Sequence, residues 1–206
     1  MRGNRPNQYK VFMSRISFVV VMGSLLLFLG ACTRESNYDR LVKTEMANGV
    51  YSDSLKFGLL LGDTKKTFYT KCWELNLEGV ISHGPNNDFV AYELEGVNEG
   101  ERINHLFYGV FDDQNIMTGL DMRFYHLGWA PWNKQLFADQ LLPKALETLE
   151  LWYPGNEFVR IDREGLPRDT YVKVDGNRQI LAYVLDDKEV KAVITDLRKK
   201  YPDLAR

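Results

Sequence analysis

The sequence is poor in cysteine and histidine, the most common zinc ligands. It has only two cysteines, Cys32 and Cys72, and three histidines, His83, His105 and His126, among 206 residues. No H-x-H or H-E-x-x-H spacing occurs, and no cysteine pair lies near a histidine, so the usual zinc patterns are excluded. His105 and His126 lie on neighbouring predicted strands and could meet by pairing, but we expect a structural role for both. The sequence therefore predicts no metal site and no cofactor.

The motifs of common catalytic sites are also absent. There is no G-x-S-x-G elbow and no P-loop, and the run from Gly58 to Gly62 lacks the lysine that a phosphate cradle needs. The acidic pairs Asp112-Asp113 and Asp186-Asp187 have no D-x-D-x-D-G loop around them, so we interpret them as turn formers and not as calcium ligands. We expect no catalytic residues and a protein that is not an enzyme.

A long hydrophobic run is missing as well. The longest apolar segment, residues 16–29, has fourteen residues, whereas a helix that spans a bilayer needs ~20. The preceding segment carries four basic residues and no acidic residue: Arg2, Arg5, Lys10 and Arg15. This combination is typical of a secretion signal, and a permanent transmembrane span is the weaker interpretation.

The four residues Leu29-Gly30-Ala31-Cys32 resemble the lipobox that ends a bacterial lipoprotein signal. The resemblance implies cleavage before Cys32, a diacylglyceryl thioether on its sulfur and usually a third acyl chain on the new amine. Two or three acyl chains hold a protein stably on a membrane, whereas one holds it only marginally. The predicted membrane contact is thus a lipid anchor, and the alternative is a secreted protein with a coincidental cysteine.

The predicted location is the outer membrane of a bacterial cell envelope. Thr33, and not aspartate, follows Cys32, and the best-known sorting rule for such lipoproteins then favours the outer membrane. No acidic run follows, so we expect a domain that faces the periplasm. The predicted organisation is a signal peptide at 1–31, a lipidated tether with a possible short helix at 32–50 and a single α+β domain at 51–206.

Positive charge is scarce once the signal is set aside. Residues 32–206 contain 22 basic and 28 acidic residues, a formal net charge of −6 compared with −2 for the whole sequence. A nucleic-acid partner needs clustered lysine and arginine and is therefore not expected. If Cys32 is acylated, Cys72 is the only thiol left. It shares a predicted helix face with Phe68 and Leu75, so we expect it to be buried and inert.

Three helices are predicted from the spacing of apolar residues. They cover 38–47, about 64–76 and about 132–153. Asn48-Gly49 can end the first helix, and Asp63 or Thr64 can cap the second. Pro143 interrupts the third, so it either kinks that helix or starts a further one.

Segments of period two, separated by short polar turns, predict strands that pair as antiparallel hairpins. These strands cover 89–94, 103–111, 116–125, 158–161, 170–174, 179–184 and 190–194, with a possible edge strand at 79–82. Several strands follow one another without a helix, which argues against a parallel sheet. The predicted fold is α+β, an antiparallel sheet of consecutive hairpins with helices packed on one face. The repeated order of helix and strands suggests two degenerate halves.

The segment Leu59-Leu-Leu-Gly62-Asp63-Thr64-Lys-Lys-Thr-Phe68 resembles the opening of outer-membrane-assembly lipoproteins of the SmpA/OmlA type and of related inhibitor-like modules. Gly62, Thr64 and Phe68 fit that motif. Asp63 replaces its usual methionine, and the Gly-Pro that often closes it is missing after Trp73. The resemblance implies a noncatalytic scaffold that binds proteins, and it assigns no binding residue.

Trp129 and Trp132 flank Ala-Pro where a predicted strand gives way to a predicted helix. Exposed aromatic rings can anchor a protein partner or stack on a sugar, but both rings could instead tie the helix start to the sheet. We predict a membrane-anchored, noncatalytic envelope lipoprotein that binds another envelope protein. A lipoprotein that binds a small ligand or glycan through Trp129 and Trp132 is the alternative, and an enzyme ranks third.

Overall fold

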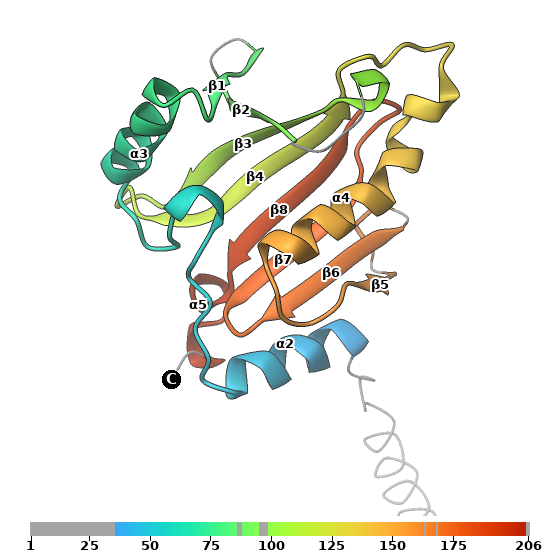
Figure 1. Ribbon diagram of the computed structural model, residues 1–206. Helices are drawn as coiled ribbons and strands as arrows, with labels where there is room; N and C mark the ends of the chain where they lie inside the picture. Colours follow the sequence, from blue (N-terminus) through green and yellow to red (C-terminus); the bar gives the residue numbers. More distant parts are fainter. Residues whose placement is uncertain (1–35, 86–87, 95–98, 163, 168, 205–206) are drawn as a thin grey trace, which may run out of the picture. The chain divides into compact units, whose positions relative to one another are not determined.

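The computed structural model describes residues 36–85, 88–94, 99–162, 164–167 and 169–204 (Figure 1). Almost all of them belong to one compact unit that begins at Asn37. The predicted signal segment and Cys32 lie outside the described residues. Among the residues that are described, no helix is both long and apolar enough to cross a bilayer.

One antiparallel sheet of eight strands lies at the centre of this unit, in the order β1-β2-β3-β4-β8-β7-β6-β5 (Figure 1). The strands are β1 (Ser82–His83), β2 (Val90–Glu93), β3 (Ile103–Phe111), β4 (Met117–His126), β5 (Val159–Ile161), β6 (Thr170–Asp175), β7 (Arg178–Val184) and β8 (Val190–Asp196). Consecutive strands pair as hairpins within β1 to β4 and within β5 to β8, and the sheet is open because β1 and β5 form its two edges. The predicted α+β fold is confirmed.

The sheet consists of two halves with the same topology. Helix α3 (Lys65–Leu77) precedes β1 to β4, and helix α4 (Ala138–Trp152) precedes β5 to β8. The last strand of each half lies at the middle of the sheet, where β4 pairs with β8. At this seam a Cβ on Gly119 would lie 2.2 Å from the carbonyl oxygen of Ile194, so only glycine lets the two strands approach this closely.

Successive side chains of each strand point to opposite faces of the sheet, and one of these faces is strongly apolar. Phe107, Met122 and Ala192 lie side by side across β3, β4 and β8, and all three are fully buried. Helix α4 covers this face across the seam, in contact with β4, β7 and β8 (Figure 1). The seam and α4 therefore join the two halves in one hydrophobic core.

Helix α4 begins later than the sequence predicted. Residues Lys134–Leu136 form a short 3-10 turn, η5, and Phe137 has extended backbone at the cap position. The predicted start at 132 is therefore wrong. The helix runs through Pro143, so this proline does not start a further helix. Pro143 lies in the second turn, where its missing N–H removes one intrahelical hydrogen bond.

Helix α2 (Asn37–Ala47) packs on the opposite face of the sheet, below β6 in the view of Figure 1. Its buried side chains form a second core with β6 and with the short C-terminal helix α5 (Leu197–Lys200). The core residues are Tyr38, Val42, Met46, Val172, Val174 and Leu197. The helix expected in the tether thus packs as part of the domain, and because it covers the opposite face, the prediction that the helices pack on one face holds for α3 and α4 only. A 3-10 turn, η6 (Pro202–Leu204), follows α5.

Candidate functional site: an apolar surface on α3

Helix α3 carries apolar side chains on two of its faces, whereas an ordinary surface helix has one. Phe68 and Cys72 face the core and are 0% and 8% exposed. Tyr69, Trp73 and Leu77 follow one another at intervals of four residues on the adjoining face and are 48%, 62% and 69% exposed. We call Tyr69, Trp73 and Leu77 the α3 stripe.

Hydrogen bonds at its N-terminal end fix the position of α3. Thr64 caps the helix as predicted, with its hydroxyl oxygen accepting from the Thr67 N–H at 3.1 Å. The Lys65 N–H donates to the Asn115 carbonyl in the β3–β4 turn at 2.8 Å. Strand β2 pairs with β3 only as far as Phe107. Tyr108 and the rest of β3 thus have no β2 partner, and α3 contacts β3 at this edge.

A groove of about 600 Å³ lies between α3 and the β1–β2 hairpin. Aromatic and aliphatic side chains make up most of its lining, which includes Phe68, Tyr69, Cys72, Trp73, Ile81, Phe89, Val90 and Tyr108. The polar side chains are Asn76, Ser82, His83 and Asp88. A neighbouring, more open hollow of about 740 Å³ shares Tyr69, Asp88, Phe89 and Tyr108 with the groove. The groove thus has a largely apolar lining, whereas the neighbouring hollow is also lined by Lys65, Asp88, Asp112, Asn115 and Asp121.

The hydroxyls of Tyr69 and Tyr108 hold the two sides of the groove together. They share a hydrogen bond of 2.9 Å, which joins α3 to β3. This hydrogen bond and partial burial raise the pKa of Tyr69 to about 12. Tyr69 is therefore neutral at physiological pH, and the α3 stripe carries no charge of its own.

Cys72, His83 and Asp88 all line the groove, so we tested whether they could form a nucleophilic site. Burial raises the pKa of the Cys72 thiol to about 11, whereas an activated cysteine has a lowered pKa. Within the described residues, no hydrogen bond links these three side chains. The prediction of a buried thiol is confirmed, and its raised pKa is that of an unreactive group.

The two tryptophans that the sequence singled out lie in different environments. The Trp129 ring is half-buried and packs 6.0 Å from the Phe137 ring, and its Nε1 donates to the Asp187 carbonyl at 3.2 Å. Trp129 thus ties the loop before α4 to the β7–β8 turn. Trp132 is 84% exposed. The structure therefore leaves one ring of the predicted pair accessible as a binding surface.

The histidines on β3 and β4 do not meet. His105 lies opposite Phe124, and His126 lies opposite Ile103, two residues away along the strands. His105 is 1% exposed, neither ring nitrogen has a hydrogen-bond partner, and burial lowers its pKa to about 3. Its ring packs among aromatic rings, with centroids 4.7 Å from Phe124 and 5.0 Å from Trp152. The geometry gives His105 a packing role.

The two acidic turns form as predicted. Asp112 accepts hydrogen bonds from the N–H groups of Gln114 and Ile116, each at 3.0 Å. Asp186 accepts in the same way from Lys188 and Glu189, each at 2.8 Å. These bonds lower the pKa of Asp112, with a further contribution from Lys199. In the part of the chain that the structure describes, no three histidine, cysteine or acidic side chains converge as a metal site would require.

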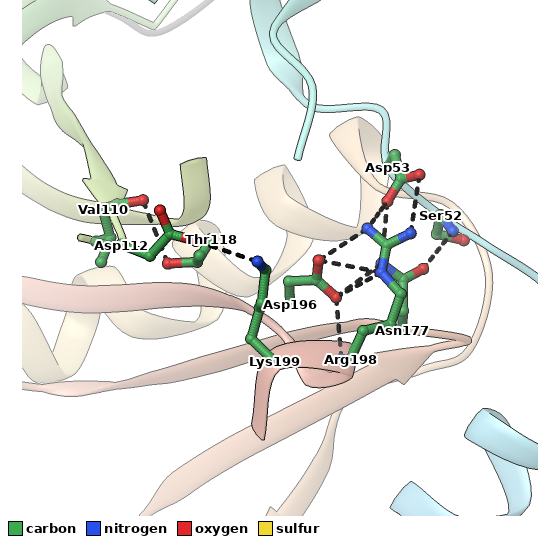
Figure 2. Close-up of polar contacts among 9 residues, drawn as sticks. All are labelled: Ser52, Asp53, Val110, Asp112, Thr118, Asn177, Asp196, Arg198 and Lys199. Carbon is green, nitrogen blue, oxygen red and sulfur yellow. Dashed lines mark hydrogen bonds and ion pairs between the residues drawn. The ribbon is translucent and has the colours of Figure 1, made fainter. Parts of the chain in front are cut away.

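A polar network joins the segment between α2 and α3, the β6–β7 turn and α5 (Figure 2). The Arg198 guanidinium bridges Asp53 at 2.5 Å and Asp196 at 2.8 Å. Asn177 donates to both carboxylates, at 3.1 and 3.2 Å, and accepts from the Ser52 N–H at 2.6 Å. The Asp196 and Asn177 side chains are nearly fully buried and satisfied by protein partners. The network therefore holds the fold together and offers no open site.

Sequence reasoning missed the α3 stripe, although its signal is visible. Tyr69, Trp73 and Leu77 repeat every four residues, and so do Phe68 and Cys72 one position earlier. Both sets fit a helix face. Spacing alone therefore predicted a buried face correctly and could not show that a second apolar face would stay in solvent.

Comparisons with known proteins identify no family. No family model matches the sequence, and no curated protein matches it. A search of solved structures found similarity to a DUF4309 family protein, YjgB, from Bacillus subtilis subsp. subtilis str. 168. The identity is 14%, the match covers 76% of this chain and 94% of that chain, and the TM-score is 0.31. A score of this size does not establish a shared fold.

Proposed function

We propose that this protein is a lipid-anchored, noncatalytic module of the bacterial envelope that binds another protein through the α3 stripe and the adjoining groove. The supporting observation is the exposed apolar stripe itself. Exposed apolar side chains scattered singly are normal, but a contiguous patch beside a groove marks an interaction site. Trp73 lies in the middle of the stripe, and tryptophan is enriched among the residues that dominate binding energy.

The lining of the groove favours a protein partner over a glycan or small ligand. Ligand sites usually enclose most of their ligand, and sugars need several hydrogen-bonding groups beside a stacking ring. This groove is open and largely apolar. Together with the adjoining hollow, it leaves room for a helix or an extended segment of a protein. The partial resemblance of residues 59–68 to SmpA/OmlA-type lipoproteins points to the same class of function.

The proposed binding surface lies at the far end of the sheet from helix α2, the first helix of the domain. Helix α2 packs on β6, next to the β5 edge, whereas the α3 surface lies beside β1. Eight strands spaced by ~4.8 Å place β1 roughly 34 Å from β5.

The binding proposal is tested by recovering partners from solubilised envelopes with the full chain as bait. We expect Trp73→Ala to reduce recovery of a stoichiometric partner at least about 10-fold, because truncating a central tryptophan removes a large share of binding energy. Trp132→Ala is the matched control, since it also removes an exposed tryptophan, and should leave recovery unchanged. Loss of the partner with Trp132→Ala alone would move the site to the Trp129 loop.

The anchor proposal is tested by mass spectrometry of the mature N-terminus. We expect a cleaved chain that begins at an acylated Cys32, and we expect Cys32→Ser to accumulate without the lipid mass. An unmodified Cys32, or cleavage at another residue, would overturn the anchor and would leave the binding proposal standing.

A further inference from the structure

The turn after helix α2 places an asparagine before a glycine in solvent. Helix α2 ends at Ala47, and Asn48 and Gly49 follow it, both exposed. Gly49 has a φ of +66°, in the left-handed region that glycine adopts without strain, and a Cβ built on it would meet nothing within 4 Å. No other asparagine in the sequence precedes a glycine.

Both reacting groups of this pair are unoccupied. Within the described residues, neither the Asn48 side-chain amide nor the Gly49 N–H has a hydrogen-bond partner. An asparagine amide and the backbone nitrogen that follows it can close a five-membered ring. Glycine in the next position leaves that nitrogen unshielded by a side chain and gives the backbone the freedom to bring the two groups together.

We infer that Asn48-Gly49 is a site of enzyme-free deamidation, which converts Asn48 into aspartate and isoaspartate. The Gly49 nitrogen attacks Cγ of Asn48, the new N–Cγ bond closes a succinimide, and the Cγ–Nδ2 bond breaks. Ammonia leaves and carries the proton of the Gly49 N–H. Water then adds to one of the two ring carbonyls: opening at Cγ gives aspartate, and opening at the main-chain carbonyl gives isoaspartate.

A second turn of the same chain shows what protects such a pair. Asp175-Gly176 could close the same ring with loss of water, but both residues are buried. The Asp175 carboxylate accepts from the Asn156 N–H at 2.7 Å and pairs with Arg178 at 3.2 Å. The Gly176 N–H donates to the Glu45 carboxylate at 3.1 Å. Ring closure there would break these contacts, whereas at Asn48 it breaks none.

The chain is held on both sides of Asn48 by the β6–β7 turn. On one side, the Glu45 carboxylate in the last turn of α2 accepts from the Gly176 N–H. On the other side, the Ser52 N–H donates to the Asn177 side chain at 2.6 Å (Figure 2). Isoaspartate adds one carbon atom to the main chain between these contacts, and both products add a carboxylate at the negative end of α2, close to Glu45 in the chain. Deamidation should therefore loosen α2 from this turn.

Ageing of the full chain, purified in detergent, tests the inference by mass spectrometry of its peptides and by enzymatic methylation of isoaspartate. We expect the peptide that contains Asn48 to exchange amide for acid and to accept the methyl group. Asn115 is the control within the chain, because it is also exposed but precedes the branched Ile116, whose N–H donates to Asp112 at 3.0 Å. Its peptide should keep the amide over the same time.

Two variants separate the chemistry from its consequence. Asn48→Gln keeps an exposed amide but would have to close a six-membered ring, so the isoaspartate signal at this position should be lost. Amide hydrogen exchange in α2 should be several-fold faster in the aged wild type than in the aged Asn48→Gln variant. Fresh Asn48→Asp carries the new charge without the longer main chain, and its exchange in α2 should lie between those two.

Three other outcomes would count against the inference. If Asn48 keeps its amide while Asn115 loses its own, the deamidation site is overturned. Conversion of both asparagines at one rate would overturn it as well, because the turn after α2 would then have no special reactivity. Isoaspartate at position 48 with unchanged exchange in α2 would overturn the loosening of α2 and support the site itself.

Discussion

The two halves of the sheet share one topology but use their helices differently. Helix α4 buries most of its apolar side chains, with Leu141 and Leu149 at most 1% exposed, and leaves Leu151 in solvent, whereas α3 exposes the three side chains of the α3 stripe. Each half-sheet needs one cover for its apolar side, and one buried face per helix supplies it. The second apolar face of α3 thus exceeds what folding requires. The first half thus carries a surplus of exposed apolar side chains, and this surplus is the surface that we propose for binding.

The two halves also differ in where their charged side chains lie. The second half buries charges inside a connected network, with Lys173 and Arg178 flanking Asp175 at 3.1 and 3.2 Å. The groove of the first half has one charged side chain beside its rings, Asp88, which is exposed. A buried network whose hydrogen bonds are all made stabilises one conformation, whereas an open apolar groove leaves surface that a partner can cover. Variants in the network should therefore lower stability, whereas variants in the α3 stripe should lower binding.

The largest expected effect is in the buried network. Asp175→Ala removes the carboxylate between Lys173 and Arg178, whose side chains are 1% and 6% exposed. Leaving buried cations without their partner should lower the free energy of unfolding by ~3–5 kcal/mol, measured by urea denaturation. Glu147→Ala, which breaks an exposed pair with Lys144, should cost less than ~0.5 kcal/mol. Equal costs for the two variants would contradict the structural role of the network.

The seam between the halves should be the next most sensitive place. Gly119→Val puts a side chain where a Cβ already lies 2.2 Å from the Ile194 carbonyl oxygen. The strands must separate, and overpacking of this kind costs up to ~3 kcal/mol. Faster amide hydrogen exchange along β8 should accompany the loss of stability. Gly100→Val is the control because a Cβ there meets nothing within 4 Å, and it should change neither measurement.

His105 should make the first half sensitive to acid. Its pKa in the folded protein is about 3, below the ordinary 6.5, so the unfolded state binds more protons between these values. Stability is therefore complete above about pH 6.5 and is lost as the pH falls. The loss is ~2 kcal/mol between pH 7 and pH 5. His105→Phe should remove that part of the pH dependence in urea titrations, whereas His83→Ala, at an exposed site, should not. An unchanged pH profile for His105→Phe would contradict the assignment.

Much of the fold could be predicted because its signals are local. The cap at Thr64 marked the start of α3, and the alternation from Ile103 to Phe111 marked both ends of β3. Asp112 marked the turn that follows β3. In each case the deciding interaction lies within a few residues of the signal. Two degenerate halves could be recognised for the same reason, since each begins with a helix.

The site could not be predicted because it depends on distant contacts. Both faces of α3 have helical spacing, and only packing against β3 decides that Phe68 points inward and Trp73 outward. Trp129 and Trp132 look equivalent in the sequence. Trp129, however, donates a hydrogen bond to the carbonyl of Asp187, 58 residues further along the chain, and this contact fixes its ring in the fold. The β4–β8 seam likewise joins segments about 70 residues apart.

The smallest effect on stability should come from the α3 stripe, and it gives the closest comparison of the two helices. Leu77 on α3 and Leu151 on α4 are 69% and 80% exposed, so Leu77→Ala and Leu151→Ala should each change the free energy of unfolding by less than ~0.5 kcal/mol. Recovery of the envelope partner should nevertheless separate them. Leu77 belongs to the α3 stripe and Leu151 does not, so Leu77→Ala should lower recovery several-fold, whereas Leu151→Ala should leave it unchanged. Equal loss with both variants would mean that exposed leucine, and not the α3 stripe, drives association.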